Sequence, residues 1–229
     1  MASLEYDDVS IIIRGKISDW TSDIVEEYKS KFINSEIIVS TWDNEDTQNI
    51  FCTVVKSKEP KMPFPHKSTL NHQVILAKEG LKKASKNLIM VCRTDQFIHG
   101  QNIFTFFNKE CPKSKILVTT FPTFLNGTPN DYRYEYGICD FCQIGTSDII
   151  HEFWDNVPFF DGSESISAAR TLVKNYVRNL KKDKEEWEAI KKKYFLELDY
   201  YKFFKIEWEK PVKTELYANL LSVEKLIQF

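Results

Sequence analysis

The chain is poor in the residues that mark fibrous, cross-linked or membrane-spanning proteins. Its 229 residues include only seven glycines and eight prolines, which excludes collagen-like and low-complexity chains. Five cysteines is an odd number in a chain long enough to bury a core without cross-links, and this favours free thiols in a reducing compartment. No apolar run approaches the roughly 20 residues that span a bilayer. We therefore expect a globular, cytoplasmic protein.

The chain also lacks an excess of charge of either sign. The 31 Lys and Arg residues nearly balance the 33 Asp and Glu residues, for a formal net charge of −2, which argues against a nucleic-acid partner. The histidines show neither H-E-x-x-H nor H-x-x-x-H spacing, and Cys139 and Cys142 have no second cysteine pair to complete a zinc site. No G-x-S-x-G sequence is present, so a serine hydrolase has no support.

What is present is an alternation of strand-like and helix-like segments. The spacing of apolar residues predicts strands over residues 9–13, 36–42, 50–55, 88–92, 115–121 and 136–143. It predicts helices over residues 18–32, 68–81, 102–107 and 145–154. Strands separated by helices indicate an α/β fold with a Rossmann-like, mainly parallel central sheet.

The pattern changes after residue 160. Residues 165–180 are amphipathic, residues 181–193 are highly charged and helix-like, and residues 194–208 alternate aromatic with charged side chains. We expect a body over residues 1–160 and a helical, aromatic-rich extension over residues 161–229 that packs on it. A peripheral contact of these aromatic residues with the inner face of a membrane stays open beside simple core packing.

Ligands of parallel α/β sheets bind beyond the carboxyl ends of the strands, which directs attention to two polar strand ends. Arg93 and Asp95 follow one strand, where a carboxylate could hold a divalent metal and an arginine a diphosphate. Arg14 and Gly15 follow another, and glycine lets a phosphate approach the backbone. The alternatives are an Asp–Arg ion pair at the first strand end and a plain tight turn at the second.

Two further segments could contact a nucleotide. Thr41, Trp42 and Asp43 end the second predicted strand, where an acid can bind ribose and an indole can stack on a base. Asn71 and Gln73 lie in the first turns of a predicted helix, where backbone N–H groups favour anions. The alternatives are a Trp that covers the sheet edge and a solvated helix face.

Asp140 stands in an otherwise apolar segment that is predicted to be a strand. A carboxyl group in such surroundings suits a general base. The alternative is a carboxylate satisfied by nearby backbone or by an arginine.

Six short motifs, in order, resemble the WavE lipopolysaccharide-synthesis family. They are VSIIIRG (residues 9–15), EIIVSTW (36–42), NHQVI (71–75), AKEGL (77–81), VCRTD (91–95) and DFCQIGTSD (140–148). The resemblance implies a GT-A-type glycosyltransferase fold. The sequence departs from the usual family pattern at Arg14, where the family more often carries Gln, and at His72, where a basic Arg is common. Asp95 also stands alone where typical GT-A enzymes have a D-x-D pair.

The resemblance implies transfer of a sugar from a nucleoside diphosphate sugar to a saccharide or glycolipid acceptor. Asp95 would bind Mn²⁺ or Mg²⁺, Arg93 and Arg14 would neutralise the diphosphate, and Asp140 would be the general base. Two alternatives stay open: a non-catalytic glycosyltransferase-like binding or assembly module, and a nucleotide-sugar-modifying enzyme, against which the missing G-x-G-x-x-G sequence counts.

Overall fold

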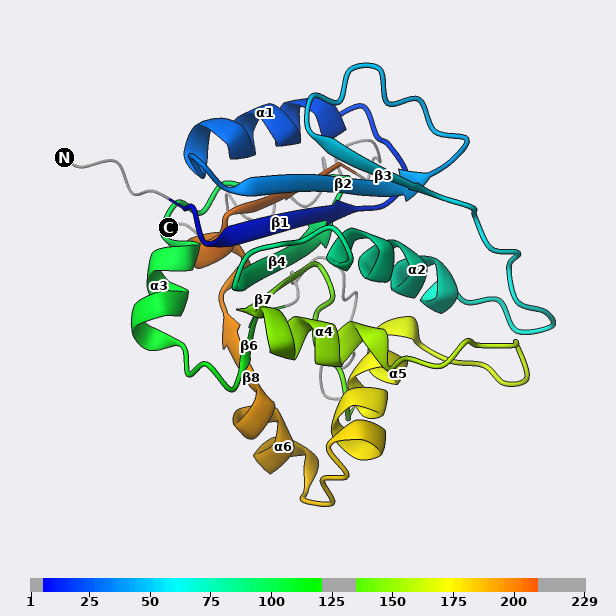
Figure 1. The fold of residues 1–229 in the computed structure, drawn as a ribbon. Helices are drawn as coiled ribbons and strands as arrows, with labels where there is room; N and C mark the ends of the chain where they lie inside the picture. Colours follow the sequence, from blue (N-terminus) through cyan, green and yellow to red (C-terminus); the bar gives the residue numbers. More distant parts are fainter. Residues whose placement is uncertain (1–5, 121–134, 210–229) are drawn as a thin grey trace, which may run out of the picture.

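The computed structural model describes residues 6–120 and 135–209, and a seven-stranded sheet forms its centre (Figure 1). The strand order is β3-β2-β1-β4-β7-β6-β8. β7 runs antiparallel to both of its neighbours, and the other neighbouring strands are parallel. The strands are β1 (Val9–Arg14), β2 (Glu36–Trp42), β3 (Thr53–Ser57), β4 (Leu88–Arg93), β6 (Ile116–Thr119), β7 (Cys142–Thr146) and β8 (Phe195–Leu198). The predicted Rossmann-like, mainly parallel α/β class is confirmed.

Helices cover both faces of this sheet. One face packs against α1 (Thr21–Lys31) and α3 (Ile103–Glu110), and the other against α2 (Leu70–Leu81), α4 (Ser147–Asp155), α5 (Ala168–Lys174) and α6 (Trp187–Tyr194) (Figure 1). Neighbouring residues of β1 serve the two cores, since Ile11 and Ile13 join the first and Ile12 the second. This alternation along a strand explains why the run of three isoleucines is buried throughout.

The strand predicted over residues 136–143 is wrong for most of its length. Tyr136 has a φ of 64°, and β7 begins only at Cys142. The segment is apolar because Ile138 and Cys139 are buried as an irregular connection, and burial alone does not make a chain extended. Gly145 and Thr146, predicted to open a helix, complete β7 instead, and α4 begins at Ser147.

The segment after residue 160 is less helical than predicted. α5 continues into the π-helical η2 (Asn175–Leu180), but the charged stretch before Trp187 forms a turn, in which the Asp183 carboxylate accepts hydrogen bonds from the Glu185 N–H (2.9 Å) and the Lys193 ammonium (2.6 Å). β8 then joins the central sheet beside β6. The division at residue 160 stays a prediction.

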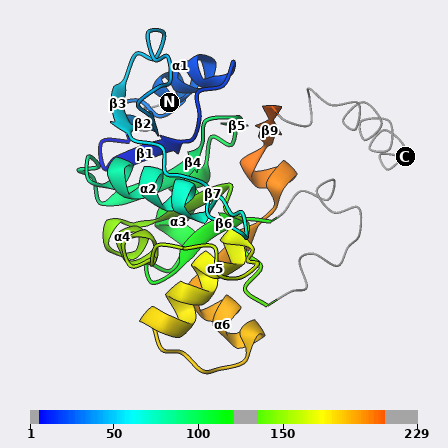
Figure 2. The same cartoon turned by 90° about the vertical axis from the view of Figure 1, so that its right-hand side faces the viewer.

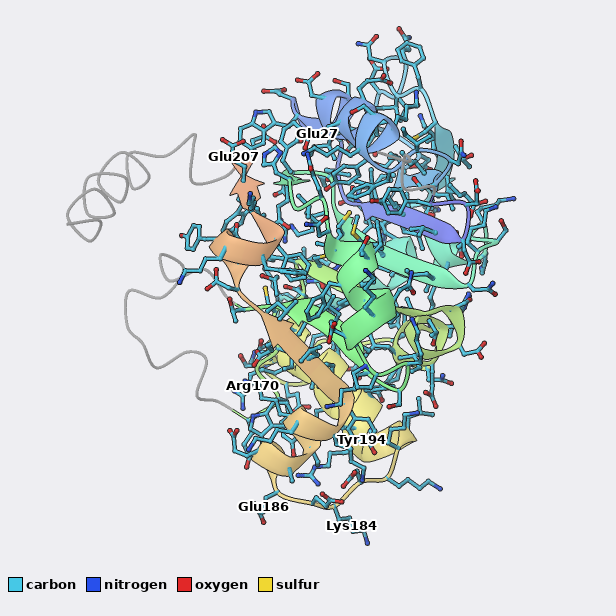
Figure 3. The ribbon with its side chains drawn as sticks, turned by 90° about the vertical axis from the view of Figure 1, so that its left-hand side faces the viewer. Glu27, Arg170, Lys184, Glu186, Tyr194 and Glu207 are labelled. Carbon is cyan, nitrogen blue, oxygen red and sulfur yellow. The ribbon has the colours of Figure 1, made fainter. Side chains whose placement is uncertain are left out.

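The last described residues return to the first half of the chain. η3 (Tyr200–Phe204) leads into β9 (Ile206–Trp208), which pairs antiparallel with β5 (Gln96–Ile98). His99 connects this pair to α1, with Nδ1 2.6 Å from Glu27 and Nε2 3.3 Å from Glu207. Figure 3 shows Glu27 and Glu207 near one another at the same end of the molecule. β9 is thereby held at the carboxyl end of β4.

Candidate functional site

A cavity of about 590 Å³ lies at the carboxyl ends of β1, β2 and β4, and we call it the strand-end hollow. It is the kind of place where open α/β sheets bind ligands. Six residues singled out from the sequence line it: Arg14, Gly15, Trp42, Gln73, Arg93 and Asp95. The predicted strand ends are thus brought together, as expected from parallel neighbouring strands.

Arg14 is a buried cation in the wall of this hollow. Its Nη2 donates a hydrogen bond to the Asp140 carbonyl oxygen (3.2 Å), and its guanidinium lies 4.9 Å from the ring centre of Trp154. Burial lowers the pKa of Arg14 to about 10, opposed by the charge of Asp140, so the side chain is charged at neutral pH. Its buried Nε has no hydrogen-bond partner among the described residues. An unused N–H on a buried arginine favours an anionic ligand.

Arg93 and Asp95 form the ion pair that was the alternative to a metal site. Arg93 Nε and Nη2 each donate to a different oxygen of Asp95, both at 2.8 Å, and Trp208 Nε1 donates to Oδ2 at 3.1 Å. The Arg93 guanidinium also lies against the rings of Phe141 (5.4 Å) and Trp208 (5.7 Å). Burial would lower the pKa of Arg93, but the hydrogen bonds and charge of Asp95 outweigh it and raise that pKa.

The predicted divalent metal at Asp95 does not fit this arrangement. Two hydrogen bonds to Oδ2 and one to Oδ1 already occupy this carboxylate, and the Arg93 cation bound to both oxygens would repel a Mg²⁺ or Mn²⁺ ion. Within residues 6–120 and 135–209, no three His, Cys, Asp or Glu side chains are grouped so that they could hold a metal ion. The described residues therefore offer no fitting metal site at Asp95.

Gly15 makes the tight turn after β1, beside the end of β4. Its φ is +148°, and its N–H donates to the Ser40 carbonyl oxygen at 3.1 Å. A Cβ at this position would lie 2.3 Å from Thr94 Oγ1, which itself donates to the Lys16 carbonyl oxygen (2.6 Å). The turn therefore requires glycine, and it presents bare backbone to the hollow.

The opposite wall carries aromatic and amide groups. Trp42 is buried and meets the His72 ring edge-on, with centroids 5.5 Å apart. His72 Nδ1 and Gln73 Oε1 are buried without hydrogen-bond partners among the described residues. Burial lowers the pKa of His72, with the charge of nearby Glu59 opposing the shift, so the ring is neutral at pH 7. Unpaired buried polar atoms on residues that line a cavity are candidates for ligand binding.

Three of the residues predicted to contact a nucleotide lie outside the lining of the hollow. Thr41 is buried beside Trp42, and Asp43 is exposed in the turn after β2, where its N–H donates to the Ser57 carbonyl oxygen (2.8 Å). Asn71 uses its whole amide on the Phe160 backbone, with one hydrogen bond to the carbonyl oxygen and one from the N–H, both 2.8 Å. Successive helix residues point about 100° apart, so Asn71 faces away from the wall formed by His72 and Gln73.

Asp140 lies at the edge of the site in the irregular segment before β7. It is half-buried, and its carboxylate is close enough to Arg14 and Arg93 to act electrostatically on both. The strand on which sequence analysis placed it is absent at this position, but its position beside the two arginines is compatible with both expected roles, general base and charge partner.

The sequence-based reasoning missed the contribution of the last described residues. Trp208 bonds Asp95 across 113 positions, and buried Glu209, whose N–H donates to the Asp95 carbonyl oxygen (3.0 Å), lines the hollow. It also missed Glu59, which forms an ion pair of 3.2 Å with Lys16 in the wall. No local motif signals these residues, because only the pairing of β9 with β5 places the C-terminal ones here.

The family model for WavE lipopolysaccharide synthesis matches residues 10–210, nearly the whole described chain. The chain belongs to the WavE family. The match spans the six motifs, the first of them from its second residue, and every residue that lines the hollow, including Glu209. No curated protein matches this WavE chain.

Solved structures similar to this WavE protein are distant. They include TarS residues 1–349 from S. aureus (12% identity, TM-score 0.47, 74% of this chain and 55% of that one) and a glycosyltransferase involved in glycosylation of the major capsid of PBCV-1 (14%, 0.44, 84% and 83%). A third is the mannosyltransferase PcManGT from Pyrobaculum calidifontis in complex with GDP-Man and Mn²⁺ (9%, 0.46, 72% and 50%). The chain thus spans about half the length of TarS 1–349. With TM-scores below 0.5, these likenesses carry no functional argument.

Among residues 6–120 and 135–209, no helix is both long enough and apolar enough to cross a bilayer.

Proposed function

We propose that this WavE-family chain is a glycosyltransferase that moves a sugar from a nucleoside diphosphate sugar to a saccharide or glycolipid acceptor in surface polysaccharide synthesis. The observation that carries the proposal is Arg14, a buried cation with an unused Nε in a hollow of about 590 Å³ at the strand ends. Family membership supplies the context of lipopolysaccharide synthesis. Contact with a membrane surface would follow from a glycolipid acceptor.

In this proposal the diphosphate binds between the two arginines. Arg14 and Arg93 line one side of the hollow, and the bare backbone of Gly15 allows close approach. As the anomeric carbon separates from the diphosphate, negative charge develops on the leaving phosphate oxygen. Fixed cations at that position stabilise the charge without reorganising, and such electrostatic stabilisation is a major source of enzymatic rate enhancement. The Arg93–Asp95 pair holds its cation in place through two hydrogen bonds.

The nucleoside would lie against the wall of Trp42, His72 and Gln73. The unpartnered His72 Nδ1 and Gln73 Oε1 supply hydrogen bonds to base or ribose. Such buried polar atoms discriminate between ligands, because a ligand that leaves them unpaired binds less tightly. Asp43 and Asn71 have no part in this binding mode.

Asp140 would act as general base in an inverting transfer. The acceptor oxygen bonds to the anomeric carbon, the bond from that carbon to the phosphate oxygen breaks, and the acceptor hydroxyl proton passes to the Asp140 carboxylate. Support for this role comes from the position of Asp140, whose carbonyl oxygen holds Arg14 at the edge of the hollow.

Calorimetric titration with UDP, GDP, CDP, ADP and dTDP tests the proposal. We expect one of them to bind, and Arg14→Gln to weaken that binding about 10- to 100-fold, the value of a charge-assisted hydrogen bond. Lys83→Gln, which removes an exposed cation beyond the end of α2, is the matched control and should bind normally. Absence of binding by all five nucleotides, or full binding by Arg14→Gln, would contradict the proposal.

A further inference from the structure

A second cavity, of about 610 Å³, lies next to the strand-end hollow, and we call it the α5 hollow. Its walls are formed by residues 158–160 and 164–167, by α5 and by Glu135 and Tyr136. Thr69 lines the first hollow and Leu70 the second. Because consecutive Cα atoms are about 3.8 Å apart, the two hollows come close to one another at the start of α2. Figure 2 shows α5 below α2 on this side of the molecule.

The loop that forms one wall is held in place from both sides. The Asn71 amide makes its two 2.8 Å hydrogen bonds to the Phe160 backbone, and the His66 N–H donates to the Gly162 carbonyl oxygen at 3.3 Å. Gly162 has a φ of +90°, and a Cβ there would come within 2.7 Å of the Phe64 backbone. The loop therefore packs closely on residues 64–66, and the hollow is formed in advance of any ligand, as small-molecule sites usually are.

The side chains around the α5 hollow suit a neutral polyhydroxyl ligand. Phe159 at its edge is 71% exposed and offers an aromatic face to the C–H face of a ring. The two cations, Arg170 and Lys174, are matched by the two acids Glu135 and Glu164, so the lining carries no net charge to attract a phosphate. The other polar side chains of the lining are neutral: Tyr136, Ser165, Ser167, Thr171, Asn175 and Asn179. Sugar hydroxyls donate and accept hydrogen bonds, as this mixture requires.

One short segment connects this hollow to the proposed chemistry. Glu135 and Tyr136 line the α5 hollow, and Arg170 Nε donates to the Glu135 carbonyl oxygen (3.0 Å); Figure 3 labels Arg170. Five residues further along, the Asp140 carbonyl oxygen holds Arg14 in the strand-end hollow. Five residues span at most about 18 Å, so a short oligosaccharide held in the α5 hollow is within reach of Asp140.

We infer that the α5 hollow binds the neutral saccharide of the acceptor while the strand-end hollow binds the nucleotide-sugar donor. This inference rests on the proposed glycosyltransferase function. It names a second ligand site, built from the loop of residues 158–167 and α5, and a chemical class for its ligand.

Saturation-transfer NMR with the full chain and five probes tests the inference: maltotetraose, cellotetraose, mannotetraose, chitotetraose and lacto-N-neotetraose. We expect at least one to bind, and Phe159→Ser to weaken it about tenfold, as loss of an aromatic contact to a ligand does. Phe51→Ser is the matched control, because Phe51 is 67% exposed and lines neither hollow. Glu164→Ala, also at an exposed position, provides a second variant, and thermal denaturation checks that each variant is folded.

The outcomes separate this inference from the proposed function. Saccharide binding that survives in both Phe159→Ser and Glu164→Ala overturns it, as does failure of all five saccharides to bind. If nucleotides bind and saccharides do not, the proposed function stands and this inference fails. If saccharides bind through Phe159 and no nucleotide binds, the site assignment stands and the proposed function fails.

Discussion

The two hollows lie side by side and have similar volumes, but the fold builds them differently. The strand-end hollow takes its charged groups from the ends of buried strands, where Arg14 is 5% and Asp95 9% exposed. The α5 hollow takes its groups from a loop, a short helix and an irregular segment, and Glu135, Glu164 and Arg170 are exposed. Buried strand ends hold charges in fixed positions, which suits the stabilisation of a leaving group, whereas loops on a rigid scaffold suit recognition of a variable partner.

The difference also appears in how charges are paired. Arg93 has two hydrogen bonds to one carboxylate and aromatic rings beside it, and Arg14 has an aromatic ring and a carbonyl oxygen. Arg170 in the α5 hollow bonds a backbone carbonyl oxygen at the surface. Substitutions in one hollow should therefore affect binding of that hollow's ligand only, and we expect the larger effects on binding and turnover in the strand-end hollow.

The largest effect is expected from Asp140→Asn. If the carboxylate takes the acceptor proton, its loss should lower turnover about 10²- to 10⁴-fold. Nucleotide affinity should be unchanged or higher, because a negative charge near Arg14 is removed. The measurement is release of nucleoside diphosphate from the sugar nucleotide of the base that binds, with exposed Asp23→Asn as control. Unchanged turnover in Asp140→Asn would place the base elsewhere, and no release by the wild type would favour the non-catalytic binding module.

A pair of glycine substitutions should affect one hollow each. Gly15→Ala introduces a Cβ 2.3 Å from Thr94 Oγ1, and Gly162→Ala introduces one 2.7 Å from the Phe64 backbone, both at positive φ. Each should lower the free energy of unfolding by about 1–3 kcal/mol, measured by urea denaturation. We expect Gly15→Ala to weaken nucleotide binding and Gly162→Ala saccharide binding. If either variant lost both nucleotide binding and saccharide binding, the two hollows would not be independent sites.

Asn71→Ala sharpens the comparison because the sequence placed this residue in the nucleotide site. In the structure the Asn71 amide makes two hydrogen bonds to the Phe160 backbone. The substitution should therefore lower the free energy of unfolding by about 1–3 kcal/mol and reduce saccharide binding, while nucleotide affinity is retained. Thermal denaturation and both titrations measure this, with exposed Asn44→Ala as the matched control. A selective loss of nucleotide binding would restore the original assignment.

The smallest effect is expected from metal removal. Because both Asp95 oxygens accept hydrogen bonds from Arg93 and Trp208, chelation with EDTA should leave nucleoside diphosphate affinity within about twofold. Titrations in EDTA and in millimolar MnCl₂ make the comparison. A gain of about tenfold or more with Mn²⁺ that disappears in Asp95→Asn would show that the metal displaces Arg93.

Local patterns in the sequence located most of the fold and part of the site. The apolar runs of β1, β2 and β4 are continuous because both faces of these strands are buried, so their polar ends could be recognised as neighbours. The same reasoning failed over residues 136–141, where apolar residues are buried in an irregular connection. Sequence position also gave no sign that the Asn71 amide bonds the Phe160 backbone, because an N-terminal place in a helix does not show which residues face the loop of residue 160.

The sequence by itself determined the α/β class, the strand ends that gather Arg14, Gly15, Trp42, Arg93 and Asp95, and the family to which the chain belongs. Hydrophobic periodicity and strand-end chemistry are local properties, readable from neighbouring residues. Only the tertiary structure decided that the Asp95 carboxylate accepts hydrogen bonds from Arg93 and Trp208. It also decided that Glu209 lines the strand-end hollow and that a second hollow lies beside it. The hydrogen bond from Trp208 to Asp95 joins residues 113 positions apart. Contacts of this kind depend on the path of the whole chain.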